Sequence, residues 1–473
     1  MRGKTDIKST MKKRNYDVII VGAGPAGLFA AYEFSKTGKR ILIIDKGKDI
    51  EERKCPILEG KVKECIDCKP CGIMSGIGGA GLFSDGKLNF IPKLGKTDLT
   101  EFMRYDEAVE LIDYTEKIFN DFGMDGKVYP SDMKRAKEIR GKSRRMGVDL
   151  LLIRQKHLGS DKLPNYIARI VRYLVEHNTD FLTGTEVKDF IVVDGVMRGV
   201  ITDKGNIYSD FTIAAPGRIG AEWLANIVKR YNIGTKQRGI EVGVRVEVPS
   251  VVTAPITNVI YDPTFFIYTE TYDDLIRTFC TNRNGYVARE NYADFACVNG
   301  YANKGEKSEN TNFAFISKVV LTHPVTDTYA YGLSIGRLSS TIGGQKPIIQ
   351  RFTDLKRGRR STWDRINKSY VKPTFLDVTP GDISMALPHR IVMNVVEGLE
   401  KLDNVMPGVA SNETLIYAPE IKFFSVQIET TNHFETAIRN FFVAGDGAGV
   451  SGNIVGAAAT GIYAARGVME KEL

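Results

Sequence analysis

The sequence predicts an α/β fold with more than one domain, and three observations carry this prediction. A short apolar strand, a glycine-rich turn and an amphipathic helix follow one another within residues 18–35. A second strand leads into another glycine-rich turn near the opposite end, at residues 441–447. The chain has 473 residues, more than one hydrophobic core usually organises, so we expect two or three domains.

The composition is that of a globular protein, with 43% hydrophobic and 26% charged residues. A membrane-spanning helix needs roughly 18 or more apolar residues in succession, and the sequence contains no such run, so no membrane association is expected. Residues 1–15 are basic and polar and lack a hydrophobic signal core. We interpret them as a flexible tail on a cytoplasmic protein.

The net charge of +8 mildly favours anionic partners. Two stretches concentrate the positive charge, one from Lys134 to Arg145 and one from Lys356 to Arg360. Such runs are most often solvated faces of helices and loops. An anionic substrate or a nucleic acid is the alternative.

Residues 16–45 have the pattern of a βαβ unit that binds a dinucleotide. Gly22, Gly24 and Gly27 form a GxGxxG motif directly after the first strand, and Asp45 ends the second strand. Gly22 permits the tight turn, Gly24 lets the backbone approach a pyrophosphate, and Gly27 allows close packing of helix on strand. The helix N-terminus stabilises phosphate, and Asp45 can accept hydrogen bonds from a ribose hydroxyl. The sequence therefore predicts a Rossmann-like domain with a bound dinucleotide.

A second motif decides which dinucleotide we expect. In residues 438–465, a short strand leads into Gly445-Asp446-Gly447, and a helix of small residues begins near Gly452. This arrangement resembles the C-terminal flavin motif of the glutathione-reductase-like FAD superfamily. The resemblance implies that Asp446 binds the ribityl or pyrophosphate part of FAD and that the helix N-terminus points at the flavin pyrimidine ring. Residues 211–217 (FTIAAPG) match the middle motif of the same superfamily.

The three motifs imply an FAD-binding domain assembled from separate parts of the chain. The sequence contains no second GxGxxG followed by an acid, so a separate nicotinamide-binding domain is not expected. The residues that we expect to contact FAD are Gly22, Gly24, Pro25, Ala26, Gly27, Asp45, Lys46, Gly79, Gly81, Ser84, Gly217, Gly445, Asp446, Gly452, Asn453 and Ile454.

Four of the six cysteines lie within 17 residues, at Cys55, Cys65, Cys68 and Cys71. Structural disulfides are rare in cytosolic proteins, so a local cluster indicates metal binding or redox activity. The two x2 gaps let three thiolates converge on one centre, and Cys55 can return as the fourth ligand. This spacing favours a [4Fe–4S] cluster over tetrahedral zinc. A redox dithiol and unligated thiols are the remaining alternatives.

The segment after the cysteines is rich in glycine and ends in Ser84-Asp85-Gly86-Lys87. Such a backbone can run close to the flavin ring. Lys87 could lie near the flavin or bind a substrate anion, and Asp85 could take a proton. The alternative is a loop that packs on FAD without a catalytic side chain. Residues 77–88 (IGGAGLFSDGKL) are similar to a motif of a largely uncharacterised family of FAD-dependent dehydrogenases, and this resemblance spans nearly the whole chain from Tyr16 onward.

The predicted fold is therefore a discontinuous, three-layer, Rossmann-like FAD-binding domain together with an α+β substrate domain. We assign residues 16–95, 180–237 and 405–473 to the FAD-binding domain. Residues 96–179 show helical spacing and are predicted to form a mainly helical insertion. Residues 238–404, with strand-like stretches, are predicted to form a substrate or cap domain with a β-sheet.

The substrate domain offers few catalytic candidates. His389 is a candidate acid or base, although a lone histidine is more often structural. Arg245 could bind an anionic substrate or serve only in packing, and Glu413 and Thr414 could line a pocket.

These expectations lead to an FAD-dependent oxidoreductase that acts on a small organic molecule, with a cysteine-ligated iron–sulfur cluster relaying electrons. Ferredoxin or NAD(P)H is the expected electron donor, and chemistry of this kind belongs mainly to the cofactor. The alternatives are an RNA-acting flavoprotein, a cluster-free NAD(P)H-dependent reductase or monooxygenase, and a regulatory flavoprotein.

Overall fold

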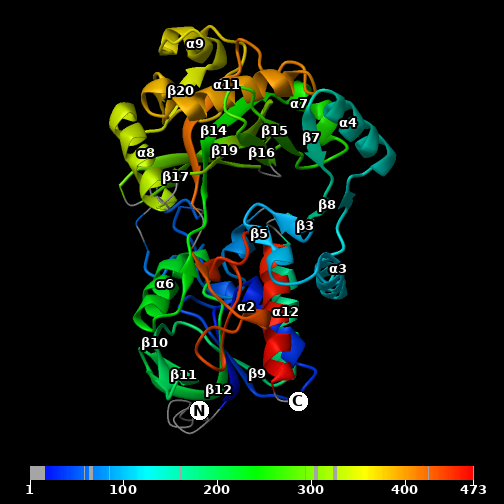
Figure 1. The fold of residues 1–473 in the computed structure, drawn as a ribbon, viewed down its shortest axis with the longest axis vertical. Coiled ribbons are helices and arrows are strands. Elements are labelled where there is room, and N and C mark those ends of the chain that lie inside the picture. Colours follow the sequence, from blue (N-terminus) through cyan, green and yellow to red (C-terminus); the bar gives the residue numbers. More distant parts are fainter. Residues whose placement is uncertain are drawn as a thin grey trace. The chain divides into compact units, whose positions relative to one another are not determined.

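The computed structural model describes residues 16–57, 59–62, 66, 68–84, 86–159, 162–292, 294–302, 307–322, 327–423 and 426–471. The chain divides into two compact units (Figure 1). Unit 1 comprises residues 1–126, 156–238 and 425–473, and unit 2 comprises residues 127–155 and 239–424. Each unit has a β-sheet of its own and a hydrophobic core of its own.

Unit 1 is built on a seven-stranded sheet with the order β10-β11-β12-β1-β2-β9, in which β24 also pairs with β12. The strands β9, β2, β1, β12 and β24 are parallel, whereas β10, β11 and the first half of β12 form an antiparallel meander. The strands are β1 (Tyr16–Val21), β2 (Ile41–Ile44), β9 (Thr179–Leu182), β10 (Val187–Val193), β11 (Val196–Thr202), β12 (Gly205–Ala214) and β24 (Phe441–Val443).

Five α-helices belong to the described part of unit 1, namely α2 (Pro25–Phe34), α3 (Tyr105–Asp121), α5 (Leu163–Glu176), α6 (Ala221–Arg230) and α12 (Ile454–Glu470). The backbones of α2 and α12 approach each other closely, because a Cβ atom on Gly461 would lie 2.0 Å from the carbonyl oxygen of Ala26. Small residues on both helices permit this approach, which brings the two ends of the chain together. Short segments complete the unit: β3 (Lys87–Phe90), β4 (Lys93–Leu94), β5 (Thr97–Asp98), β13 (Thr235–Lys236) and β23 (Gln427–Ile428).

Unit 2 is built on an eight-stranded sheet with the order β21-β20-β22-β14-β19-β16-β15-β7. The neighbouring strands are antiparallel except for β20 and β21. The strands are β7 (Val148–Leu151), β14 (Ile240–Pro249), β15 (Thr264–Tyr268), β16 (Leu275–Asn282), β19 (Asn310–Val319), β20 (Ile348–Arg351), β21 (Thr379–Pro380) and β22 (Leu415–Lys422).

Along β14, alternate residues are apolar, and this row of valines belongs to the core that also contains the apolar face of α11 (His389–Asp403). This alternation is the expected pattern of a strand whose two faces meet different surroundings. The remaining strands are β6 (Val128–Tyr129), β8 (Arg154–His157) and the hairpin of β17 (Tyr286–Asn291) and β18 (Ala296–Tyr301). The remaining α-helices are α4 (Met133–Arg145), α7 (Ser250–Thr257), α8 (Thr328–Gly343), α9 (Phe352–Lys356) and α10 (Trp363–Asn367).

The predicted fold class is confirmed, since a Rossmann-like unit is accompanied by a mixed unit with a large sheet. The division of the chain differs from the predicted boundaries at two places. Residues 127–155 join unit 2 rather than a helical insertion, because β7 pairs with β15. Residues 405–424 also join unit 2, because β22 lies between β14 and β20.

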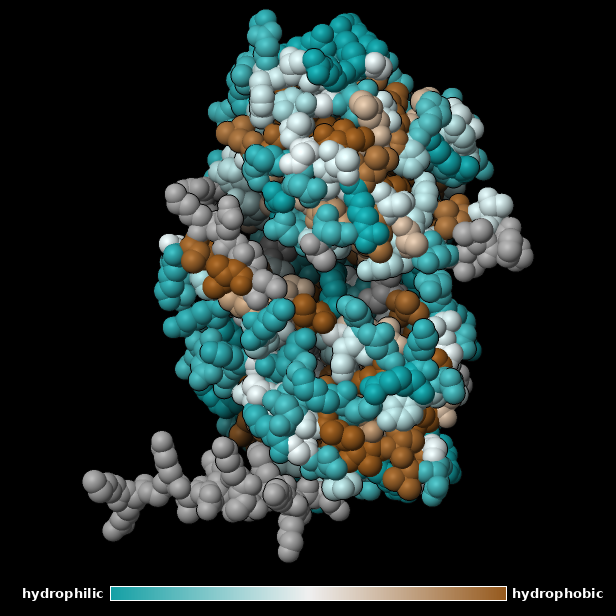
Figure 2. Space-filling model, turned by 90° about the vertical axis from the view of Figure 1, so that its left-hand side faces the viewer, coloured by the Kyte–Doolittle hydropathy of each residue, from teal (hydrophilic) through white to brown (hydrophobic). Residues whose placement is uncertain are grey.

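No helix among the described residues is long and apolar enough to cross a membrane. Figure 2 shows one face of the molecule, on which apolar residues appear in separate groups among hydrophilic ones.

Candidate functional site

A cavity of about 380 Å³ opens where the parallel strands of unit 1 end. Val21 closes β1, Asp45 follows β2, Ala215 follows β12 and Gly445 lies two residues after β24, and all four residues line the cavity. Parallel strands present their carboxyl ends at one edge, which is where ligands bind in open α/β sheets. The topology thereby brings all three glycine motifs to one place.

Glycine makes the turn after β1 possible. Gly22 has a φ of +109°, and a Cβ atom on it would lie 2.1 Å from the carbonyl oxygen of Ala215. Any larger residue would push apart the β1 and β12 ends of the cavity. Gly27 has the packing role expected of the third glycine, since its Cβ atom would lie 2.0 Å from the carbonyl oxygen of Gly22. Gly27 is also the one predicted cofactor residue that does not line the cavity.

Two helix N-termini meet at the cavity. Gly24 caps α2 without a side-chain hydrogen bond, and Pro25 and Ala26 line the cavity beside it. At the start of α12, the Asn453 side chain accepts a hydrogen bond from the Gly456 amide at 2.7 Å. Helix N-termini carry partial positive charge and free N–H groups, so this wall favours an anionic ligand such as a pyrophosphate.

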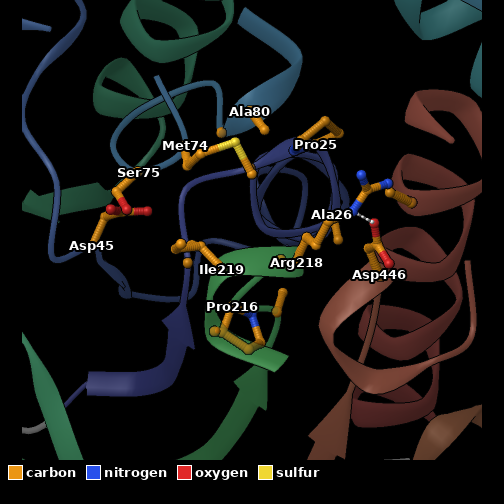
Figure 3. Close-up of a pocket in the computed structure, with 18 of the residues that line it drawn as sticks. Pro25, Ala26, Asp45, Met74, Ser75, Ala80, Pro216, Arg218, Ile219 and Asp446 are labelled. Carbon is orange, nitrogen blue, oxygen red and sulfur yellow. Dashed lines mark hydrogen bonds and ion pairs between the residues drawn. The ribbon is translucent and has the colours of Figure 1, made fainter. Parts of the chain in front are cut away.

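The Asp45 carboxylate organises the opposite wall, as Figure 3 shows with Asp45 and Asp446 on opposite sides of the view. Its oxygens accept hydrogen bonds from the backbone amides of Ala23 at 2.9 Å, Gly47 at 2.8 Å and Gly76 at 2.9 Å. Asp45 therefore connects three loops by hydrogen bonds. It also lines the cavity, where its carboxylate could accept a hydrogen bond from a ribose hydroxyl.

Arg53 is a buried residue that the sequence analysis did not identify. Its guanidinium donates to the carbonyl oxygens of Gly72 at 2.9 Å, Ile73 at 2.6 Å, Ile77 at 2.6 Å and Gly79 at 2.9 Å. Burial lowers its pKa to about 10, so it remains protonated at neutral pH. Arg53 thus holds the loop that contributes Met74, Ser75 and Gly79 to the cavity.

A group of charges surrounds Asp446. The buried Lys96 ammonium pairs with one Asp446 oxygen, and Arg218 Nε donates to the other at 3.2 Å (Figure 3). Burial, with the positive charges of Arg218 and Arg238, lowers the pKa of Lys96 to about 7. The contact with Asp446 favours the charged form, so the charge of Lys96 responds to its surroundings near neutral pH. Lys96 was also missed by the sequence analysis.

The turn that carries Lys96 supports the α12 end of the cavity. The Thr97 hydroxyl accepts hydrogen bonds from the Gly452 amide at 2.9 Å and from the Asn453 side chain at 3.0 Å. A Cβ atom on Gly452 would lie 2.4 Å from Lys96 Cγ. A residue larger than glycine at position 452 would therefore collide with the side chain of Lys96.

Fifteen of the sixteen predicted cofactor residues line this one cavity, Gly27 being the exception. Other lining residues were not predicted, and they come mostly from the loop after the cysteines and the turn after β12. These include Met74, Ser75, Ala80, Pro216, Arg218, Ile219 and Trp223. A signal for part of this set was present in the FTIAAPG motif, whose following residues were not considered.

Three of the four predicted metal ligands are described. Cys55, Cys68 and Cys71 are half-buried free thiols, whereas Cys65 lies outside the described residues. The backbones on either side of this segment touch, because a Cβ atom on Gly72 would lie 2.3 Å from the carbonyl oxygen of Lys54. Within the described part of the chain, no three His, Cys, Asp or Glu side chains are grouped closely enough to hold a metal ion. The cluster therefore stays a prediction.

Lys87 and His389, two of the predicted catalytic residues, lie outside this cavity. Lys87 is half-buried at the start of β3 and does not line the cavity, and Asp85 lies outside the described residues. His389 is exposed at the first position of α11 in unit 2. In the same unit, Glu413 lies 3.9 Å from Arg351, and the buried Thr414 hydroxyl donates to the carbonyl oxygen of Val409 at 2.8 Å.

Arg245 has the packing role rather than the substrate-binding role. Its side chain is completely buried, and it forms a two-pronged ion pair with Glu420, with distances of 2.7 and 2.9 Å. It also donates to Asn312 Oδ1 at 2.8 Å. Its donors are consequently occupied within unit 2.

Three sequence families match parts of the chain. Residues 263–422 match the family described as FAD-dependent protein, C-terminal domain-like. Residues 20–50 match the NAD(P)-binding Rossmann-like domain, and residues 376–472 match glucose inhibited division protein A.

Relatives are distant over the full length. An uncharacterized protein of Clostridium beijerinckii is 22% identical over 98% of this chain and 83% of its own. Digeranylgeranylglycerophospholipid reductase 3 of Methanosphaera stadtmanae is 45% identical, over 14% of each chain. Among solved structures, a quinol fumarate reductase FrdA variant of E. coli covers 97% of this chain and 70% of its own, with 12% identity and a TM-score of 0.45.

The fold, the glycine-lined cavity and the matching families together define the class of this protein, which is an FAD-dependent oxidoreductase.

Proposed function

We propose that this protein is a dehydrogenase or reductase of a small organic molecule, with FAD bound in the cavity of unit 1. Two helix N-termini and three glycine turns converge on that cavity, and this convergence supports the proposal. The N-cap of α2 makes no side-chain hydrogen bond, whereas the N-cap of α12 is the side chain of Asn453. A bound FAD would supply the hydride or single-electron transfer.

The residues around the cavity have distinct parts in this proposal. The N-terminus of α2 binds the pyrophosphate, and Asp45 accepts a ribose hydroxyl. The N-terminus of α12 stabilises negative charge on the flavin ring, because a helix N-terminus favours anions. Lys96, Asp446 and Arg218 form a charge group beside that end of the cavity, where Lys96 can hold a proton near neutral pH.

We further propose that Cys55, Cys65, Cys68 and Cys71 hold a [4Fe–4S] cluster that passes single electrons to the flavin from a ferredoxin-like donor; without a cluster, NAD(P)H would reduce the flavin directly by hydride transfer. Two features support this step. The C-x2-C-x2-C spacing suits an iron–sulfur cluster. The cysteine segment also continues directly into the cavity wall, since Met74 lies three residues after Cys71.

Anaerobic purification followed by a visible spectrum and by iron, sulfide, zinc and FAD analysis tests both proposals. We expect one FAD and about four irons per chain. The variant Cys68→Ser should lose iron and keep FAD, whereas Cys280→Ser, a half-buried thiol of unit 2, should keep both. FAD without iron in the wild type would reject the relay and leave the flavoenzyme, and zinc would reassign the cysteines to a structural site. A chain without FAD under all conditions would reject the proposed function.

A further inference from the structure

The helix α4 in unit 2 carries an unusual excess of positive charge. Its 13 residues include seven lysines and arginines and a single acid, Glu138. The helix buries Ala136 and Ser143 on one side. With about 100° per residue, Lys134 and Arg145 lie opposite that side, together with Glu138, and Lys137 lies next to them; all four residues are exposed. The cationic face of α4 is defined by Lys134, Lys137 and Arg145.

Only part of this charge stabilises the helix: Arg145 lies in the last turn, where the dipole favours a cation, and Glu138 lies four residues after Lys134. Lys134 lies in the first turn, where the helix dipole disfavours a cation and no acidic residue is present. Lys134 and Lys137 are also neighbours of like charge along the helix, which is destabilising. Among the described residues, no carboxylate pairs with Lys134, Lys137 or Arg145. With seven cations and one acid, the helix keeps a net charge of +6, which suits a partner with negative charge.

A hollow of about 390 Å³ adjoins the C-terminal end of α4. Phe266 and Tyr268 line it from the same face of β15, and Arg144 and Asp149 line it as an ion pair with a distance of 2.6 Å. Tyr268 is 59% exposed, although it is a large aromatic residue. Lys401 lies beside the hollow, with Nζ 3.3 Å from the carbonyl oxygen of Tyr268.

The combination of cations with the exposed ring of Tyr268 favours one kind of anionic partner. Single-stranded nucleic acids bind where a positive track contacts the backbone and aromatic side chains stack on the bases. An acidic protein would use the cations without needing open rings beside them. At 1.5 Å per residue, α4 is about 20 Å long, enough for a few nucleotides.

We propose that the cationic face of α4 and the adjoining hollow bind a single-stranded segment of nucleic acid, with its phosphates on the helix and a base on Tyr268. This site is separate in chemistry from the FAD cavity, and it does not depend on the proposed electron relay.

The test uses the full-length, FAD-loaded protein and a fluorescein-labelled 20-nucleotide oligouridylate, with fluorescence anisotropy measured at several KCl concentrations. Wild-type affinity should fall steeply with salt. The triple variant Lys134→Gln, Lys137→Gln, Arg145→Gln should bind at least about tenfold more weakly at low salt, and its log–log salt slope should be smaller by about 2, because each lost phosphate contact removes about 0.7. Tyr268→Ala should lower the affinity about fivefold or more and leave the slope unchanged.

The control is a triple of equal charge change on exposed residues of unit 1, Arg198→Gln, Lys229→Gln, Lys236→Gln, which should bind almost as the wild type does. Three results would overturn the proposal. The wild type binds no oligonucleotide at low salt, the control weakens binding as much as the α4 triple, or polyglutamate competes as well as RNA while Tyr268→Ala has no effect. The last result would assign the face to an acidic protein instead.

Discussion

Charged side chains are arranged differently in the two units. In unit 2, Arg245 and Glu420 are both completely buried and satisfy each other, and Lys422 adds a second cation to Glu420 at 2.9 Å. In unit 1, Asp446 is shared by Lys96 and Arg218 at the edge of an open cavity, and Arg218 remains 62% exposed on its side chain. Burial of charge is thus more complete in the unit that lacks the flavin motifs.

The difference shows that a buried ion pair by itself does not mark a functional site. A fully buried ion pair has no remaining donors or acceptors for a ligand. Removing one of its two partners leaves an uncompensated charge in the protein interior. The charges around the cavity are instead adjacent to open space and to helix N-termini, where an incoming anion can change their balance.

The largest effect is expected for Arg245→Met. Removing the guanidinium leaves Glu420 buried beside Lys422 alone, so the free energy of unfolding should fall by about 3–5 kcal/mol. Chemical denaturation measures this loss. The matched control Arg289→Met breaks a partly exposed pair with Asp377 in the same unit and should cost at most about 1 kcal/mol. FAD content should not change in either variant, and loss of FAD from Arg245→Met alone would contradict the structural role of this pair.

A smaller effect is expected for Gly22→Ala. The added methyl group would contact the Ala215 carbonyl, and alanine is strained at a φ of +109°, which together cost about 1–3 kcal/mol. If that strain is relieved by opening the cavity, FAD affinity should fall about tenfold or more, measured by equilibrium dialysis with visible absorbance. Gly38→Ala is the control, because Gly38 also has a positive φ of +72° but meets no atom within 4 Å. Equal FAD affinity in both variants would show that backbone strain, rather than the approach of β1 to β12, governs this position.

The smallest effect concerns the pH dependence of Lys96→Met. The pKa of Lys96 falls from 10.5 to about 7 on folding, so the unfolded chain binds more protons between these two values. The stability of the wild type relative to the variant should therefore rise as the pH increases from about 7 to 10. Lys93→Met, in the same turn but 69% exposed on its side chain, should show no such rise. Unfolding curves at pH 6, 8 and 9.5 test this sign. A difference that does not change over this range would mean that the contact with Asp446 outweighs burial, because Lys96 would then be protonated in both states.

Local patterns were sufficient for much of the fold. The helix predicted within residues 18–35 is α2, and the strand-like stretches predicted in residues 238–404 include β14 and β15. The boundaries between the units could not be predicted in the same way. The pairing of β7 with β15 joins residues more than 100 positions apart, and no local pattern of residues encodes that choice.

The candidate site likewise has features that local sequence predicted and features that depend on tertiary contacts. Glycine motifs predicted the cavity, because a tight turn or close backbone approach restricts the residue type at one position and leaves a trace in the sequence. Arg53 and Lys96 left no such trace, since each acts through partners that the chain brings together only on folding. The same holds for Arg245, whose choice between a substrate and a buried partner depended on where Glu420 lies.

Residue patterns alone were enough to predict the βαβ unit at residues 16–45, the second flavin motif near the opposite end of the chain and the α/β class. These features depend on short-range periodicity and on glycine at fixed positions. Folding settled which residues share the cavity, which charged side chains form fully buried ion pairs and where the chain divides into its two units. Those outcomes depend on contacts between segments far apart in the sequence, and on the burial of charge that such contacts create.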